Sequence, residues 1–232
     1  MTTKRTLEDF RTGVRYLTDT EDDSEFVAPV ELTKYVNEGI ADLFDVRVDA
    51  NPNLFALNGP KLVLNGPANS AYAWLLPNTF RQLVAVHIRD GGYQYPAVQA
   101  DPTEYPELDV SPPERQQAKY FLREEFGKGI KELYIFPAIA SADDIAWTYV
   151  PLSPVLSLDS DEFWGTNDEL EYIEVYAAIK VADKEETDSE NLVSRRSELK
   201  KRIRNATKDA DLGGPRTIRR VRGRVQRWRG HS

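Results

Sequence analysis

The chain has 232 residues, which is enough for one sizeable hydrophobic core or two modest ones. It carries 30 Lys and Arg against 38 Asp and Glu, a formal net charge of −8, and it has no cysteine. The lack of cysteine excludes a disulfide framework, a thiolate nucleophile and a Cys-ligated metal. No apolar run follows the opening Met-Thr-Thr-Lys-Arg, so we expect no signal peptide, no membrane segment and synthesis in a cytoplasm.

Residues 1–48 are expected to form a pair of helices. Thr6 is a suitable cap for the first helix, because Glu8 and Asp9 then lie in its first turn, where the helix dipole favours acids. The second helix is expected to begin near Pro29, a favoured first-turn residue. Its apolar stripe recurs at the helical period, at Leu32, Val36, Ile40 and Leu43.

Residues 49–157 are expected to form an inserted, β-rich domain. Twelve of the 14 prolines lie between Pro52 and Pro154, and proline is costly inside helices. Gly91-Gly92 predicts a hairpin turn, and the proline-rich segment 101–113 predicts a long loop. Runs rich in aromatic and β-branched residues predict antiparallel strands within 61–65, 71–77, 81–90, 93–98, 118–124, 131–137 and 144–150.

Residues 158–212 are expected to form a helical hairpin. The segment 169–186 is apolar over most of its circumference, which predicts a central position in the helical packing. Asp188 or Ser189 is a suitable cap for the following helix, which is expected to end near Ala210. The sequence thus predicts an α+β fold. Its parts are a four-helix core (the two N-terminal helices and the C-terminal hairpin), an inserted antiparallel β domain and an extended C-terminal arm.

The residues that usually carry catalysis are few. The two histidines are His87, within a predicted strand, and His231, next to the C-terminus, and no common catalytic or nucleotide-binding motif occurs. Asp159, Asp161 and Glu162 are a carboxylate cluster of the kind used by glycosidases, but they lie just before an expected helix, where acids are favoured by the dipole alone. We therefore expect no enzyme, no cofactor and no metal.

The second helix of the hairpin carries a run of basic residues. We single out Arg195, Arg196, Lys200, Lys201 and Arg204. One interpretation is a solvated face whose cations suit the negative end of the helix. The other is a cationic face turned toward a DNA channel or a neighbouring subunit.

The last segment, residues 213–232, is a basic C-terminal arm. It holds seven arginines and no acid, whereas residues 1–212 hold 23 basic and 38 acidic residues. Apolar residues interrupt the arginines at the spacings three, four and three, which is typical of a segment that orders on binding. The candidate partner-binding residues are Arg216, Ile218, Arg219, Arg220, Val221, Arg222, Arg224, Val225, Arg227, Trp228 and Arg229.

The order of these segments resembles the head-to-tail adaptor (connector) proteins of tailed bacteriophages, including the group called tail tubular protein A. "TLEDFRTGVRYL" followed by "VELTKYVNEGIADLF" resembles their opening helix pair, with Asn37 in the second helix. "AYAWLLPNTFRQLVAVHI" is similar to their strand–Leu-Pro–strand segment. "KELYIFPAIASADDIAWTYVPLSPVLSLDSDEFW" looks like their closing hairpin and the proline-rich passage into the third helix. The resemblance covers nearly the whole chain.

The resemblance implies a structural virion protein of the neck, between capsid and tail. It implies a ring of this chain, a homododecamer, whose C-terminal arms dock onto the portal protein and whose other face meets a tail or nozzle protein. DNA would pass through the channel without specific binding. Two alternatives stay open: a nucleic-acid-binding protein that uses the Arg/Trp arm, and, less favoured, a peptidoglycan hydrolase of the tail.

Overall fold

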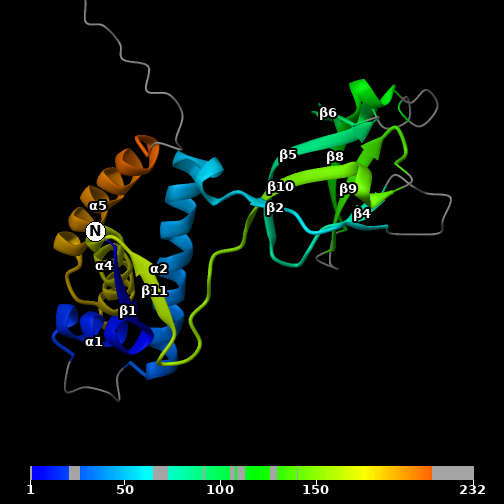
Figure 1. Cartoon of the computed structure of the whole chain (residues 1–232). Coiled ribbons are helices and arrows are strands. Elements are labelled where there is room, and N and C mark those ends of the chain that lie inside the picture. The colour runs from blue at the N-terminus through cyan, green and yellow to red at the C-terminus, as the bar shows by residue number, and fades with distance from the viewer. Residues whose placement is uncertain are drawn as a thin grey trace, which may run out of the picture.

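The computed structural model describes residues 2–20, 27–64, 73–90, 92–104, 108, 113–125, 130–139 and 141–210. Within these residues the chain is a mixed α+β protein with four α-helices and sheets that are almost wholly antiparallel, as the sequence predicts. Figure 1 shows the helices gathered in one part of the molecule and the two larger sheets in another. Two crossings of the chain join these parts, one after α2 (Pro29–Ala50) and one after β10 (Ile145–Pro151).

The first two helices begin where the sequence predicts. Helix α1 (Leu7–Thr18) starts at Thr6, whose hydroxyl accepts a hydrogen bond from the Asp9 amide at 3.1 Å. The Asp9 carboxylate accepts one from the Thr6 amide at 2.9 Å, which completes a capping box. Helix α2 has Pro29 in its first turn, and the four residues of its predicted apolar stripe are all buried.

The last two helices form an antiparallel hairpin. Helix α4 (Asn167–Glu185) packs against α1, α2 and α5 (Glu190–Lys208) and is buried on most sides, as its apolar composition predicts. On α5 the buried stripe is narrower, with Leu199 and Ile203 at its centre. All four helices contribute to one buried apolar cluster. Asp188 accepts a hydrogen bond from the Glu190 amide at 2.9 Å, so this aspartate, rather than Ser189, makes the side-chain contact at the start of α5.

A two-stranded ribbon lies beside the helices, and the sequence analysis missed it. Strand β1 (Thr3–Thr6) pairs antiparallel with β11 (Glu162–Gly165), with Thr3 opposite Gly165 and Thr6 opposite Glu162. The prediction that the acids at Asp159–Glu162 lie just before a helix is therefore wrong, because Asp159 and Asp161 lead into β11 and Glu162 is its first residue. The two strands lie far apart in the chain, and a pairing between distant segments leaves no local sequence pattern.

The β part contains two sheets. The first has the order β2-β10-β5-β6, with β2 (Leu57–Asn58), β5 (Phe80–Asp90) and β6 (Tyr93–Pro96) beside β10. The second has the order β3-β4-β9-β8-β7, with β3 (Val63–Leu64), β4 (Ala73–Leu75), β7 (Val98–Gln99), β8 (Lys119–Glu125) and β9 (Ile130–Phe136). The pair β7–β8 is parallel, which corrects the expectation of a purely antiparallel β domain.

The predicted β-hairpin at Gly91-Gly92 is confirmed by the pairing of β5 with β6, in which Asp90 lies opposite Tyr93. Gly92 has a φ of 89°, in the left-handed region that a tight hairpin turn requires and that glycine adopts at little cost. Of the predicted loop 101–113, the structure describes residues 101–104, 108 and 113, with a 3-10 turn at Pro102–Glu104.

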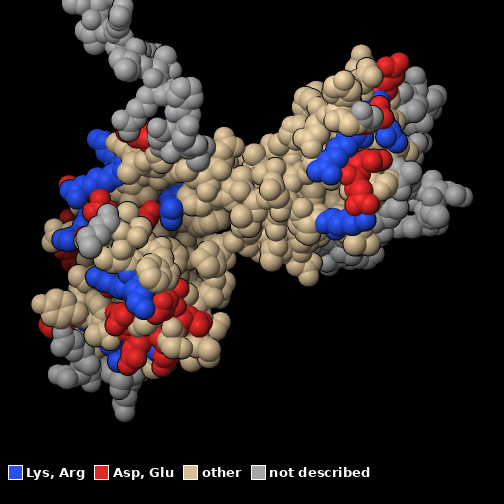
Figure 2. Space-filling model, in the orientation of Figure 1, with Lys and Arg blue, Asp and Glu red and all other residues tan. Residues whose placement is uncertain are grey.

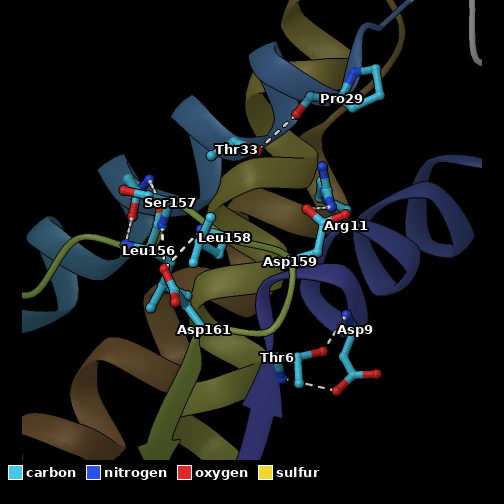
Figure 3. Close-up of polar contacts among 11 residues, drawn as sticks. Thr6, Asp9, Arg11, Pro29, Thr33, Leu156, Ser157, Leu158, Asp159 and Asp161 are labelled. Carbon is cyan, nitrogen blue, oxygen red and sulfur yellow. Dashed lines mark hydrogen bonds and ion pairs between the residues drawn. The ribbon is translucent and has the colours of Figure 1, made fainter.

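The chain returns from the β part to the helices through residues 152–161, which we call the strap. The side-chain amide of Asn37 on α2 forms two hydrogen bonds with the strap at Leu156. Its Oδ1 accepts from the Leu156 amide at 2.8 Å, and its Nδ2 donates to the Leu156 carbonyl at 2.9 Å. Further along, the Asp161 carboxylate accepts from the amides of Ser157 and Leu158 at 2.7 and 2.8 Å (Figure 3). The Asn37 bonds hold the strap against α2, and the Asp161 bonds fix a turn within the strap.

Candidate interaction surface on the last helix

Charged side chains are unevenly spread over the face of the molecule that Figure 2 shows. Lys and Arg gather over α5, acids gather at the α1 end of the helical part, and the junction between the two parts carries few charges. The basic residues that the sequence singled out on α5 fall into two sets, because some are used within the subunit and others face solvent.

Arg196 belongs to the first set and lies in a polar network between three helices. Its guanidinium donates to the Asp42 carboxylate on α2 at 2.8 Å and to the Tyr172 hydroxyl on α4 at 3.3 Å. It also lies over the ring of Tyr176, 4.6 Å from the ring centroid, where a cation is attracted by the π electrons. Tyr172 in turn donates to Asp42. Arg196 therefore fastens α5 to α2 and α4.

The network shifts the ionisation of its members. Burial alone disfavours the Asp42 anion, but the hydrogen bonds from Tyr172 and Arg196 outweigh it, and the pKa of Asp42 is lowered. Burial and the hydrogen bond to Asp42 raise the pKa of Tyr172 to about 12. At neutral pH the network thus consists of a carboxylate, a neutral phenol and a guanidinium.

Tyr172 is expected to make the helical part sensitive to strong alkali. Because its pKa is raised from 10.0 to about 12, its contribution to the free energy of unfolding is complete below pH 10 and is lost as the pH rises through 12. Chemical denaturation at intervals from pH 9 to 12 should show this decline, and Tyr172→Phe should reduce it. The exposed Tyr93→Phe is the control, and an equally steep decline in Tyr172→Phe and wild type would contradict the assignment.

The remaining singled-out residues of α5 are closer to solvent. Arg195 is exposed and pairs with Glu171 on α4, while Lys200 is half-buried and helps to lower the pKa of Asp42. Lys201 and Arg204 are exposed and make no ion pair within the described part of the chain. Glu198 and Arg202, four residues apart on α5, form an ion pair at 3.9 Å. Lys201 and Arg204 are thus the members of the set left open to a partner.

The arm itself lies outside the described residues, which end at Ala210 on this side. This applies to all the candidate partner-binding residues between Arg216 and Arg229. Their roles stay predictions.

The carboxylates at the end of the strap have structural contacts. Asp159 pairs with Arg11 on α1, and Glu162 pairs with Lys4 on β1 at 2.6 Å (Figure 3 shows the first). The two backbone amides that Asp161 binds lower its pKa, the opposite of what a general acid in glycoside hydrolysis needs. These contacts give Asp159 and Asp161 a structural role in the strap and Glu162 a structural role in the ribbon.

Other chemistry is sparse among the described residues. His87 is half-buried within β5, opposite Ala146 of β10, and no group of three His, Cys, Asp or Glu side chains that could hold a metal ion is found there. Among the described helices, none combines the length and the apolar composition of a transmembrane segment.

Sequence reasoning missed the Asp42–Tyr172–Arg196 network and the grip of Asn37 on the strap. Tyr172 lies in the apolar segment 169–186, and the sequence gives no sign of which tyrosine in a helix meets a carboxylate from another helix. Asn37 is half-buried beside the apolar stripe of α2, one residue after buried Val36. A polar residue that borders such a stripe is the available sequence signal, because half-buried polar groups usually have a hydrogen-bond partner. Compared with known proteins, the chain matches no family model and no curated protein sequence.

Proposed function

We propose that the protein is a structural virion protein, a head-to-tail adaptor that forms a ring, docks onto the portal through its C-terminal arm and connects the capsid to the tail around the DNA channel. In this proposal the four helices are the ring-forming core, the β part is an insertion that faces a tail or nozzle protein, and residues 213–232 reach out of the subunit. The protein has no chemistry of its own.

The observation that supports the proposal most is the way the chain leads into the arm. Helix α5, about 28 Å long for its 19 residues, is fastened to α2 and α4 by Arg196 and buries Ile203 and Thr207 in its last turns. Nearby, Arg47 Nε on α2 lies 3.2 Å from Glu169 Oε1 on α4, close enough for an ion pair although the N–H points elsewhere. The cationic arm therefore follows a rigid base.

Length and charge suit an arm that binds in another molecule. The 18 residues after Gly214 span about 60 Å when extended, more than the length of α5. Guanidinium groups form bidentate hydrogen bonds with carboxylates, and an indole between arginines can be buried in a pocket of a partner. A ring with many copies of the arm multiplies a modest affinity per copy.

Deletion of residues 216–232 tests the proposal. The full chain is expected to be a monomer alone and a ring when mixed with portal rings, as measured by native mass spectrometry. The deleted chain should stay monomeric in the mixture, while its circular dichroism matches that of the full chain. A variant with all seven arm arginines replaced by lysine keeps the charge and should bind more weakly, because lysine lacks the bidentate fork. Undiminished portal binding by the deleted chain would overturn the proposal.

The exposed Lys201 and Arg204 favour nucleic acid as the second candidate partner. A nucleic-acid-binding protein would show an affinity for duplex DNA that falls steeply with salt and is lost in the deleted chain. The adaptor predicts weak DNA binding, because the rest of the chain is acidic. The same two proteins, titrated with DNA at several salt concentrations, therefore separate the candidates.

A further inference from the structure

The helical part and the β part have separate cores. One buried cluster consists mainly of side chains from the four helices, with Leu156 of the strap, and Phe163 of the ribbon packs against it. The clusters of the β part contain Trp74, Trp147 and their neighbours from the two larger sheets. Two parts that each bury their own apolar residues, and meet over a small area, are free to change their relative orientation unless specific contacts hold them.

Both crossings between the parts are short and are anchored at each end. In the first, the Asn51 amide closes helix α2 by donating to the Arg47 carbonyl at 2.9 Å, and β2 is already paired with β10. In the second, the Leu152 amide donates to the Thr79 carbonyl of the β part at 2.7 Å, and Asn37 holds Leu156 on α2. Between these anchors lie residues 52–56 in the first crossing, of which Pro52–Phe55 form a 3-10 helix beside α2, and residues 153–155 in the second. Any rotation of one part against the other takes place at these residues.

One side chain of the β part reaches across to α2. Arg81, near the start of β5, forms an ion pair with Asp45 and lies over the ring of Phe44, 5.4 Å from its centroid. Phe44 in turn meets Phe55 of the first crossing edge-to-face, with ring centroids 5.5 Å apart. Arg81 thus contacts Phe44, the same residue of α2 that packs against Phe55 of the first crossing.

We propose that Arg81 is a latch that sets the orientation of the β part relative to the helices. The ion pair and the cation–π contact both require the present orientation, since Asp45 and Phe44 lie on the rigid helix α2 and Arg81 lies on the longest strand of its sheet. Without the latch, the crossings at 52–56 and 153–155 permit the β part to turn. This role of Arg81 is independent of the adaptor proposal, because it concerns the subunit alone.

The absence of cysteine makes the test direct. The substitutions Tyr16→Cys on α1 and Tyr93→Cys on β6 place one spin label on each part, at two exposed positions. Pulsed electron paramagnetic resonance then measures the distribution of distances between the two labels in the full chain. The wild-type background should give one population. Arg81→Ala should add a second, with the ratio of latched to unlatched molecules falling about tenfold, as expected for loss of a partly exposed ion pair and a cation–π contact.

Matched variants separate a latch from general destabilisation. Arg89→Ala removes an arginine of the same strand that donates within the β part, to the Asp143 carbonyl, and should leave the distribution unchanged. Exchange of the charges in Arg81→Asp with Asp45→Arg should restore much of the first population. The thermal midpoint by circular dichroism should change little in all of them. An unchanged distribution in Arg81→Ala, or two populations already in the wild type, would overturn the proposal.

Discussion

Replacement of Gly59 by alanine is expected to lower the free energy of unfolding by about 3 kcal/mol, at the upper end of the range for overpacking a core. Gly59 lies between β2 and β3 and its amide donates to the Trp147 carbonyl at 2.8 Å. A Cβ at this position would collide with the indole of Trp147, near its Cδ2, Cε2 and Nε1 atoms. The collision involves a ring and not the end of a flexible side chain.

The indole has little room to move away. Trp147 is buried, stacks on Tyr149 with ring centroids 4.7 Å apart and meets Phe80 on another side at 6.3 Å. Its Nε1 donates to the Pro60 carbonyl at 2.8 Å, so a shift of the ring also breaks a hydrogen bond. The alanine therefore displaces either the aromatic cluster or the chain at 59–60, and each displacement costs free energy.

Urea denaturation followed by tryptophan fluorescence and circular dichroism measures the loss. Gly92→Ala is the matched control, because a Cβ there meets nothing within 4 Å and the cost comes from its positive φ, about 1 kcal/mol. The double variant Gly59→Ala with Trp147→Leu should lose less than the sum of its two single variants, since the leucine makes room for the methyl group. If Gly59→Ala were no more costly than Gly92→Ala, the steric explanation would be wrong.

Local signals predicted much of the fold. The cap at Thr6, the start of α2 at Pro29 and the hairpin at Gly91-Gly92 each depend on a few neighbouring residues, and all three are confirmed. The helical period placed the buried stripe of α2 correctly. On α1, Leu17 follows Val14 at helical spacing but is partly exposed, at 38%. Val14 is the last residue of α1 in the buried cluster, so the buried face ends one turn before the helix does.

The features that the sequence did not predict depend on distant partners. The ribbon β1–β11 joins the N-terminal strand to a segment that directly precedes α4, and the parallel pair β7–β8 joins two strands separated by the loop 101–113. The candidate site shows the same limit. Basic residues at Arg196 and Arg204 look alike in the sequence, yet one is fixed to Asp42 and the other faces solvent, because only the packing of α2 against α5 decides which cation has a partner.

Asn37→Ala is expected to lower the free energy of unfolding by about 3 kcal/mol, because it leaves two buried backbone groups without partners. The Asn37 side chain satisfies both the amide and the carbonyl of Leu156, and Leu156 is 5% exposed. Each unpaired buried group costs about 1–3 kcal/mol, and alanine cannot replace either bond. The higher helix propensity of alanine recovers about 0.5 kcal/mol of this loss.

A matched control and a hydrogen-exchange measurement test whether the bonds between Asn37 and Leu156 hold the strap on α2. Asn205→Ala is the same substitution at an exposed position of helix α5, so it carries the gain in helix propensity without the lost bonds and should be neutral or slightly stabilising. Hydrogen exchange should show the Leu156 amide losing protection in Asn37→Ala, while the Leu152 amide, bound to Thr79 on the β part, keeps its protection. Equal stability of the two alanine variants, or an unchanged exchange rate at Leu156, would show that another contact holds the strap on α2.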